Sequence, residues 1–356
     1  MIVRVKNSIS HTQSNVCAHM FLDFNGDAVE FVDDNADVVL FDSAQEVPSN
    51  SKIKICVDLA HASENKVRGW SNIGWVCRFI SDVYVLQECY DPSFQHPSII
   101  SYDFIWNRSK AYYTNKTFEY CSGTFAPWYY NSPTSYLLQN LSSADNKTRI
   151  FLSPSKLHRL KTIFRQRLVE VLSKKKYDNL GYLGASLPNK KSSPTLFGNH
   201  IIPTASNVQS LVNSGYSSSV YGYMPVHNAY YNETFLSVYG ETFEHGTSYV
   251  VTEKTLDPLL KGHFVLPFAN AGFVQYVKSQ GWRLPDFIDY SYDYIDDNNL
   301  RFVSYCQELD RLLNLSMNKW RQHWVDNLDI LHYNRNQLYE RDYDRVDLKK
   351  LLEAQE

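Results

Sequence analysis

Short apolar runs of strand length are the feature that most constrains what this chain can fold into. In the N-terminal part they lie at 36–41, 52–57, 83–86 and 98–102, and polar or turn residues bound each of them. They are rich in β-branched residues and nearly continuous rather than alternating, as in strands buried on both faces of a mostly parallel sheet. We also interpret residues 1–6 as a charged strand at the edge of this sheet. This part of the chain is therefore predicted to be an α/β domain.

A second alternation of helices and strands follows. Apolar residues recur at helical spacing from Leu157 to Leu172, and Ser153–Ser155 is a predicted cap for that helix. Strands at 235–239 and 264–268 then alternate with a helix that begins at Thr252, a pattern typical of a doubly wound sheet.

The length of 356 residues is sufficient for two such domains. We predict an α/β protein of two Rossmann-like domains that face a cleft. The N-terminal domain is expected over 1–149, the C-terminal domain over 150–325, and a helical tail over 326–356.

The formal net charge of −3 gives no global attraction to nucleic acid or to anionic lipid, but the charge is unevenly distributed. Segment 156–176 has eight Lys or Arg residues against one acid, whereas 286–310 has seven acids against Arg301 alone. The basic segment is therefore a candidate site for an anionic ligand, with an ordinary solvated helix face as the alternative.

The six cysteines form no C-x-x-C pair and show no zinc-ligand spacing, so we predict no metal site. We interpret them as reduced thiols of a cytoplasmic protein. No apolar run has the length of a membrane-spanning helix or follows the N-terminus as a signal peptide would, so we predict no membrane span.

Several common catalytic motifs are absent from the sequence. It contains no G-x-x-x-x-G-K-S/T, no G-x-G-x-x-G, no G-x-S-x-G and no H-E-x-x-H. This argues against P-loop NTPases, nicotinamide dehydrogenases, α/β-hydrolase esterases and zincin proteases. A methyltransferase is disfavoured because no glycine-rich turn follows the first strand.

The most distinctive segment runs from Glu241 to Gly262. Thr252 is a predicted helix cap, which places Glu253 and Lys254 in the first helical turn. The exposed N–H groups and the positive end of the helix dipole suit an anion such as a diphosphate, and a carboxylate beside them suits ribose hydroxyls. The alternative is an ordinary helix start with Lys254 in solvent.

The same segment resembles the donor-binding motif of α1,3-fucosyltransferase-like enzymes (glycosyltransferase family 10) and of glycosyltransferases encoded by phages and large viruses. The matching positions are Glu241-Thr242, Tyr249, Thr252-Glu253-Lys254, Gly262 and Pro267, with Glu-Thr in place of the family's Glu-Asn. The resemblance implies a GT-B-like fold and a metal-independent, inverting transfer from a nucleotide-sugar, with no other cofactor. It also implies donor binding by Glu241, Tyr249, Thr252, Glu253 and Lys254.

The resemblance extends to the basic segment and to the N-terminal domain. It implies that Arg165, or alternatively Arg159, neutralises the diphosphate of the donor. A catalytic base is expected in a loop after an N-terminal strand, and the candidates are Asp58, His61, Glu64 and Asp103. For each candidate base, a cap, a packed side chain or an exposed acid is the structural alternative.

The acceptor stays open at this point. A hydroxymethylated pyrimidine in phage or viral duplex DNA is one candidate, in which case the protein would work in the host cytoplasm. A glycan, lipid or protein hydroxyl is the other, and a non-catalytic module that binds a nucleotide or glycan is the alternative class. A tyrosine-rich stretch over 211–231 is a candidate surface for stacking of sugars or bases.

Overall fold

The computed structural model divides the chain into two compact units, and each is described here by itself. Unit 1 comprises 1–108, 117–126 and 342–356, and unit 2 comprises 109–116 and 127–341. The described residues are 2–8, 29–42, 53–58, 83–87, 99–101, 141–156, 163–177, 179–186, 195–196, 228–241, 244, 249, 251–340 and 348–354.

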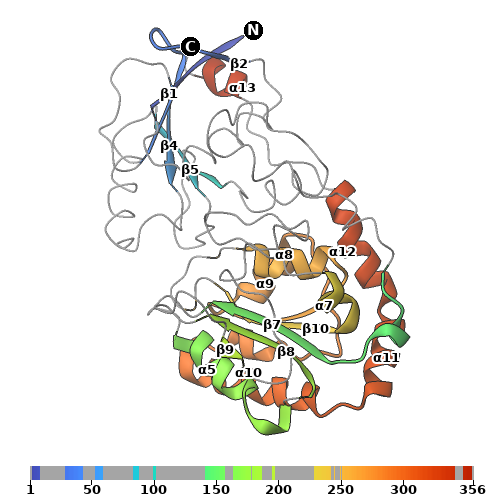
Figure 1. The fold of residues 1–356 in the computed structure, drawn as a ribbon. Helices are drawn as coiled ribbons and strands as arrows, with labels where there is room; N and C mark the ends of the chain where they lie inside the picture. Colours follow the sequence, from blue (N-terminus) through green and yellow to red (C-terminus); the bar gives the residue numbers. More distant parts are fainter. Residues whose placement is uncertain are drawn as a thin grey trace. The chain divides into compact units, whose positions relative to one another are not determined.

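Unit 1 contains a six-stranded sheet in the order β2-β1-β3-β4-β5-β6, and every neighbouring pair is parallel (Figure 1). The strands are β1 (Val3–Asn7), β2 (Val29–Phe31), β3 (Val38–Asp42), β4 (Ile53–Asp58), β5 (Val83–Gln87) and β6 (Ile99–Ser101). The parallel sheet that the apolar runs predicted is confirmed.

The prediction that the N-terminal strand lies at the edge is wrong. Strand β1 pairs with β2 on one side and with β3 on the other, so β2 is the edge strand. Val3 and Val5 are buried while Arg4 is exposed, so the charged residues that indicated an edge face solvent from an interior strand. Arg4 forms an ion pair with Asp37 there.

Unit 2 contains a five-stranded sheet in the order β11-β10-β7-β8-β9, parallel except for β9. The strands are β7 (Phe151–Lys156), β8 (Gly181–Ser186), β9 (Thr195–Leu196), β10 (Leu236–Gly240) and β11 (Phe264–Phe268). All five residues of β10 and of the edge strand β11 are buried, as expected for a sheet covered on both faces.

The predicted helix cap at Ser153–Ser155 is wrong, because these residues lie inside β7. Phe151 and Leu152 pair with both β8 and β10, whereas Pro154 pairs only with Gly184 of β8. The missing N–H of Pro154 therefore falls beyond the ladder with β10 and leaves that ladder intact. The helix that follows, α5, spans Ile163–Leu172.

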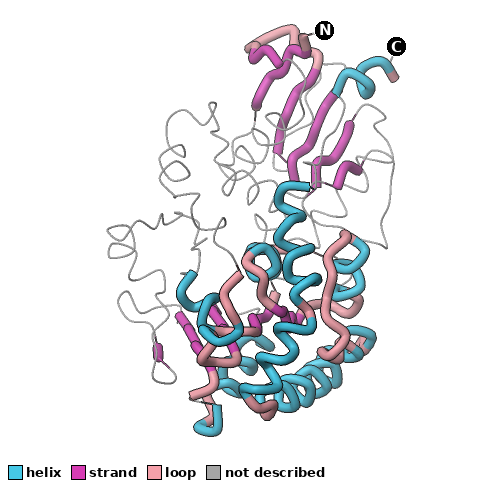
Figure 2. Tube along the Cα trace, turned by 90° about the vertical axis from the view of Figure 1, so that its right-hand side faces the viewer, coloured by secondary structure: helices cyan, strands magenta, loops and turns pink. Residues whose placement is uncertain are grey.

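Helices cover both faces of the unit 2 sheet (Figures 1 and 2). Helices α5 and α10 (Asn298–Leu313) share one face, where Phe164 packs on Phe268 and on Phe302. Helix α8 (Glu253–Leu260) lies on the other face, where the Tyr239 hydroxyl donates to Thr255, and α8 contacts α12 (Leu328–Glu340). The remaining described helices of the unit are α7 (Asn228–Glu233), α9 (Phe273–Ser279) and α11 (Met317–Asp326).

The segment expected to form a tail over 326–356 is shared between the two units. Helix α12 is part of unit 2, and α13 (Leu348–Glu353) is part of unit 1. Leu348 and Leu352 of α13 are buried.

Across the part of the chain that the structure describes, no helix is both long enough and apolar enough to cross a membrane.

The contact between β7 and β8 gives a first testable prediction. A Cβ atom at Gly181 would lie 2.4 Å from the carbonyl oxygen and from the Cδ1 atom of Phe151. Because the backbone oxygen has no room to yield, we expect Gly181→Ala to lower the free energy of unfolding by about 3 kcal/mol. Urea denaturation measures this loss.

The matched control is Gly281→Ala. That position has a positive φ of +88° with no atom within 4 Å of the added Cβ, so it reports backbone strain alone. A loss at Gly181 no larger than the loss at Gly281 would contradict the predicted contact.

Candidate functional site

The switch point of the unit 2 sheet lies between β7 and β10. The chain leaves β7 to form β8 on one side and later forms β10 on the other side. In open α/β sheets, ligands bind outside the carboxyl ends of the strands at such a point. Helix α5, which follows β7, and residues 241–252, which follow β10, both begin at this edge. The structure therefore brings the predicted donor residues Arg165, Glu241 and Thr252 to one edge of one sheet.

The carboxylate of Glu241 holds the start of α8 through hydrogen bonds. Its side chain is buried, with 1% exposure. Its carboxylate accepts from the backbone N–H of Thr252 (3.1 Å), from the Thr252 hydroxyl (2.7 Å) and from the Thr255 hydroxyl (2.7 Å). Glu241 thus fixes the first turn of α8 against the end of β10.

Thr252 caps α8, as the sequence predicted. Its Oγ1 accepts from the backbone N–H of Lys254 and also lies 3.3 Å from Lys254 Nζ. Glu253 is the first residue of α8, so Lys254 belongs to the first helical turn. The lysine is partly buried and stands beside the N–H groups of that turn.

Tyr249 joins this segment to the loop after β11. Its hydroxyl donates to the carbonyl of Ala271 (2.9 Å), and its ring stacks on Tyr276 of α9. Gly272 has a φ of +82°, and a Cβ there would lie 2.4 Å from the Tyr249 hydroxyl oxygen, so both the backbone and the packing require glycine.

Arg165 lies in the first turn of α5 and is 5% exposed. Its Nη2 donates to the backbone carbonyls of Gly240 (3.0 Å) and Glu241 (2.9 Å). The guanidinium therefore links α5 to the carboxyl end of β10 and places a fixed positive charge at that edge of the sheet. In this structure the side chain positions other residues rather than lying open to a ligand.

Sequence reasoning missed Glu244. Its side chain is buried, and its carboxylate accepts from the backbone N–H groups of Phe164 (3.2 Å) and Arg165 (3.1 Å) at the start of α5. Burial raises the pKa of Glu244 to about 7, against the opposing effects of Arg165 and the two N–H bonds. The available signal was an acid three residues after Glu241, in the loop that follows a strand.

Asp293 caps α9 in the same way, with N–H donors from Val274 (3.1 Å) and Gln275 (3.2 Å). Burial raises its pKa to about 6. The buried Arg301 also stabilises this region, because its guanidinium donates to the carbonyls of Ala269 and Glu244. Arg301, the one basic residue of segment 286–310, is thus a core residue, and burial lowers the pKa of its guanidinium.

The opposite charges of the basic and acidic segments meet within unit 2. Lys176 forms an ion pair with Asp310 of α10, and the Tyr177 hydroxyl also donates to that carboxylate. Arg167 donates to Asn299 at the start of α10. Part of the basic segment therefore binds α10 rather than a ligand, and the positive charge left for the switch point is smaller than the sequence indicated.

The pKa of Glu244 gives a second prediction. Between pH 4.5 and 7 the folded protein keeps a proton on Glu244 that the unfolded chain has released. This contribution to the free energy of unfolding is complete below pH 4.5 and falls by about 3 kcal/mol as the pH rises through 7. Glu244→Gln is expected to remove this dependence, and denaturation across a pH series measures it. Identical pH profiles for the variant and the wild type would contradict the assignment.

Other predicted residues lie in unit 1 or outside the described residues. Asp58 is the last residue of β4 and pairs with Gln87, which places it at the carboxyl end of that sheet. His61, Glu64, Asp103, Arg159 and most of the tyrosine-rich stretch lie outside the described residues.

No cluster of three or more His, Cys, Asp or Glu side chains suited to a metal ion occurs among the residues that the structure describes. Comparison of the chain with protein-family models, with curated proteins and with solved structures gave no match.

Proposed function

We propose that this protein is a GT-B-like, inverting glycosyltransferase that needs no metal ion and uses a nucleotide-sugar as donor. The observation that carries the proposal is the convergence of Arg165, Glu241 and Lys254 at the switch point of the unit 2 sheet. This is the position at which doubly wound sheets bind nucleotides. The sequence resemblance concerns the same residues and supplies the class of reaction.

Each residue has a proposed task. Lys254 contacts the diphosphate together with the N–H groups of the first turn of α8. Glu241, Thr252 and Arg165 act as positioning residues, because their polar groups hold α8 and α5 at the sheet edge. Glu253 and Tyr249 are proposed to bind the nucleotide or the sugar.

The proposed reaction is a direct displacement. The acceptor hydroxyl oxygen attacks the anomeric carbon, and the bond from that carbon to the diphosphate oxygen breaks with its electron pair on the diphosphate. The hydroxyl proton passes to a carboxylate or histidine base, for which Asp58, His61 and Glu64 are the candidates that the resemblance implies. Positive groups at the sheet edge stabilise the charge that develops on the leaving diphosphate.

The acceptor proposals differ in the binding that they predict. Duplex DNA with hydroxymethylated pyrimidines requires phosphate contacts, so its affinity should fall steeply with salt concentration. A glycan acceptor requires no such dependence. Lys176 pairs with Asp310 at the surface, so part of the positive charge that a DNA groove would use is already neutralised.

Detection of transfer tests the proposal. The full chain is incubated with UDP-, GDP- and CMP-sugars, each with either hydroxymethylated duplex DNA or an oligosaccharide mixture. Mass spectrometry is expected to show one acceptor with the added mass of one sugar. If no donor and acceptor pair gives such a product while a nucleotide still binds, the non-catalytic module is the better account.

A further inference from the structure

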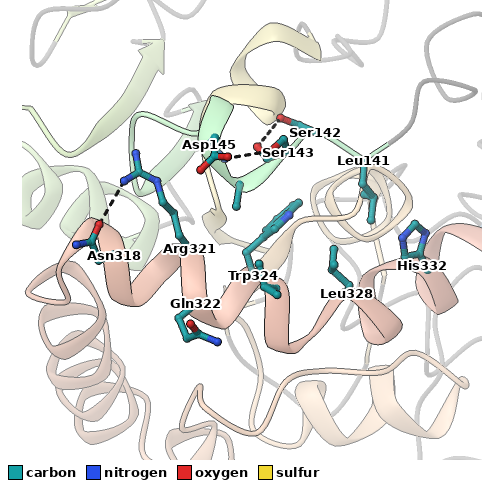
Figure 3. Close-up of a pocket in the computed structure, with 12 residues that line it drawn as sticks. Leu141, Ser142, Ser143, Asp145, Asn318, Arg321, Gln322, Trp324, Leu328 and His332 are labelled. Atoms are coloured by element: carbon teal, nitrogen blue, oxygen red, sulfur yellow. Dashed lines mark hydrogen bonds between the residues drawn. The ribbon is translucent and has the colours of Figure 1, made fainter.

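A pocket separate from the switch point lies on the opposite edge of unit 2. It has a volume of about 590 Å³, within the range of small-molecule sites, and it is lined from the 3-10 turn η2 (Ala144–Asn146) and from helices α11 and α12. Figure 3 shows Arg321 rising from α11 toward the segment that carries Asp145, with Ser142 and Ser143 beside it.

The pocket lies at the amino ends of the strands. Trp324 of α11 packs on Phe235, which precedes β10, and on Phe264, the first residue of β11. Segment 144–150 leads from η2 directly into the start of β7. Glu241 and Thr252, by contrast, follow the carboxyl end of β10. A ligand in this pocket would therefore bind independently of the proposed donor.

The wall that carries η2 is held firmly in place. Lys147 is 1% exposed, and its Nζ donates to the carbonyls of Tyr231 (2.9 Å) and Thr234 (2.5 Å). The same atom lies 3.9 Å from the centre of the Trp324 ring, so it connects η2 to α11 beneath the pocket. A wall fixed in this way loses little entropy when a ligand binds.

The lining excludes several classes of ligand. Among the lining residues that the structure describes, Asp145 is the one acid and Arg321 the one arginine, so neither a divalent cation nor a strong anion is matched. More than half of the lining residues are polar, which excludes a lipid. The Trp324 ring is 2% exposed and therefore offers no face for a nucleobase to stack on.

The polar groups that line the pocket include both hydrogen-bond donors and hydrogen-bond acceptors. Within the described ranges, Arg321 makes only a long contact of 3.4 Å from Nη1 to Asn318, and its buried Nε has no hydrogen-bond partner there. The Ser142 hydroxyl donates to the carbonyl of Asn232, the Ser143 hydroxyl accepts from the backbone N–H of Asp145, and Asp145 itself is exposed. Leu141 and Leu328 add apolar surface to the lining, on the side of Trp324 that carries His332 (Figure 3). Neighbouring hydroxyls on a ligand need such paired donors and acceptors.

We propose that this pocket binds a neutral saccharide, with Arg321 donating to sugar oxygens and Asp145 accepting from sugar hydroxyls. Its role as an anchor for a glycan acceptor rests on the proposed function, whereas saccharide binding itself does not.

Ligand-observed NMR with the full chain and a panel of methyl glycosides and short oligosaccharides at millimolar concentration tests the proposal. At least one sugar is expected to show saturation transfer from the wild type, and Arg321→Ala and Asp145→Asn are each expected to abolish it. The matched control is Lys319→Ala, an exposed lysine of α11 that does not line the pocket and should leave the signal unchanged. Thermal unfolding verifies that each variant is folded, and Arg321→Lys serves if the alanine variant is not.

Four results would overturn the proposal: no sugar binds, binding survives both pocket variants, Lys319→Ala abolishes it equally, or free amino acids and peptides bind there in place of sugars. Nucleotide-sugar binding, measured in parallel, should be the same in Arg321→Ala and the wild type. If the wild type binds a nucleotide-sugar but no saccharide, the pocket proposal alone is refuted. Saccharide binding with no nucleotide binding refutes the proposed function and leaves the pocket as a glycan site.

Discussion

Lys254→Ala is expected to lower kcat for sugar transfer by about 10²–10³-fold, the usual cost of removing one group that stabilises a developing negative charge. Lys254 lies in the first turn of α8, beside the capping Thr252, where the proposed diphosphate would contact both its ammonium and the helix N–H groups. The loss should appear in kcat as well as in KM, because the charge on the diphosphate grows in the transition state.

The matched control for this substitution is Lys278→Ala. Lys278 is an exposed lysine of α9 in the same unit, so its removal changes the net charge equally without touching α8. If the two variants transfer sugar at the same rate, Lys254 has no part in the reaction. If the wild type itself shows no turnover but binds a nucleotide through Lys254, the protein is a binding module with this fold.

Glu241→Ala is expected to lower the free energy of unfolding by about 4 kcal/mol, since it leaves a buried N–H and two buried hydroxyls of α8 without their acceptor. The donors are Thr252 N–H, the Thr252 hydroxyl and the Thr255 hydroxyl. Urea denaturation of the variant measures the loss.

Two comparisons make the Glu241 prediction specific. Glu241→Gln keeps an acceptor oxygen and is expected to lose about 1–2 kcal/mol, because hydrogen bonds to a neutral group are weaker. Glu340→Ala, at an exposed position in α12, is expected to change the stability by less than about 0.5 kcal/mol. A Glu241→Ala variant as stable as Glu340→Ala would contradict the proposal that the carboxylate holds α8.

The sequence was most informative where one local pattern determines the structure. Continuous apolar runs identified strands β3 to β6, because a strand buried on both faces needs no polar alternation. Thr252 was identifiable as the cap of α8 because an N-cap depends only on the residues beside it.

Contacts between distant segments could not be predicted from the sequence. Glu244 caps α5 from a segment about eighty residues away, and no local pattern records that contact. The resemblance implied that Arg165 binds the diphosphate, and the sequence assigned no role to Arg301, yet both are buried among backbone carbonyls. The Ser153–Ser155 cap failed because pairing of β7 with two neighbouring strands outweighs a local capping preference.

A thermal-shift panel of UDP-, GDP- and CMP-sugars on the wild type and on Lys254→Ala tests the central claim most directly, namely that the carboxyl edge of the unit 2 sheet binds a nucleotide-sugar. Mass action stabilises the folded protein by about 2.7 kcal/mol at a ligand concentration one hundred times Kd, which raises Tm by several degrees. The account predicts this rise for one class of nucleotide with the wild type and a clearly smaller rise with Lys254→Ala. An unchanged Tm with every nucleotide-sugar, or an equal rise in both proteins, would contradict it.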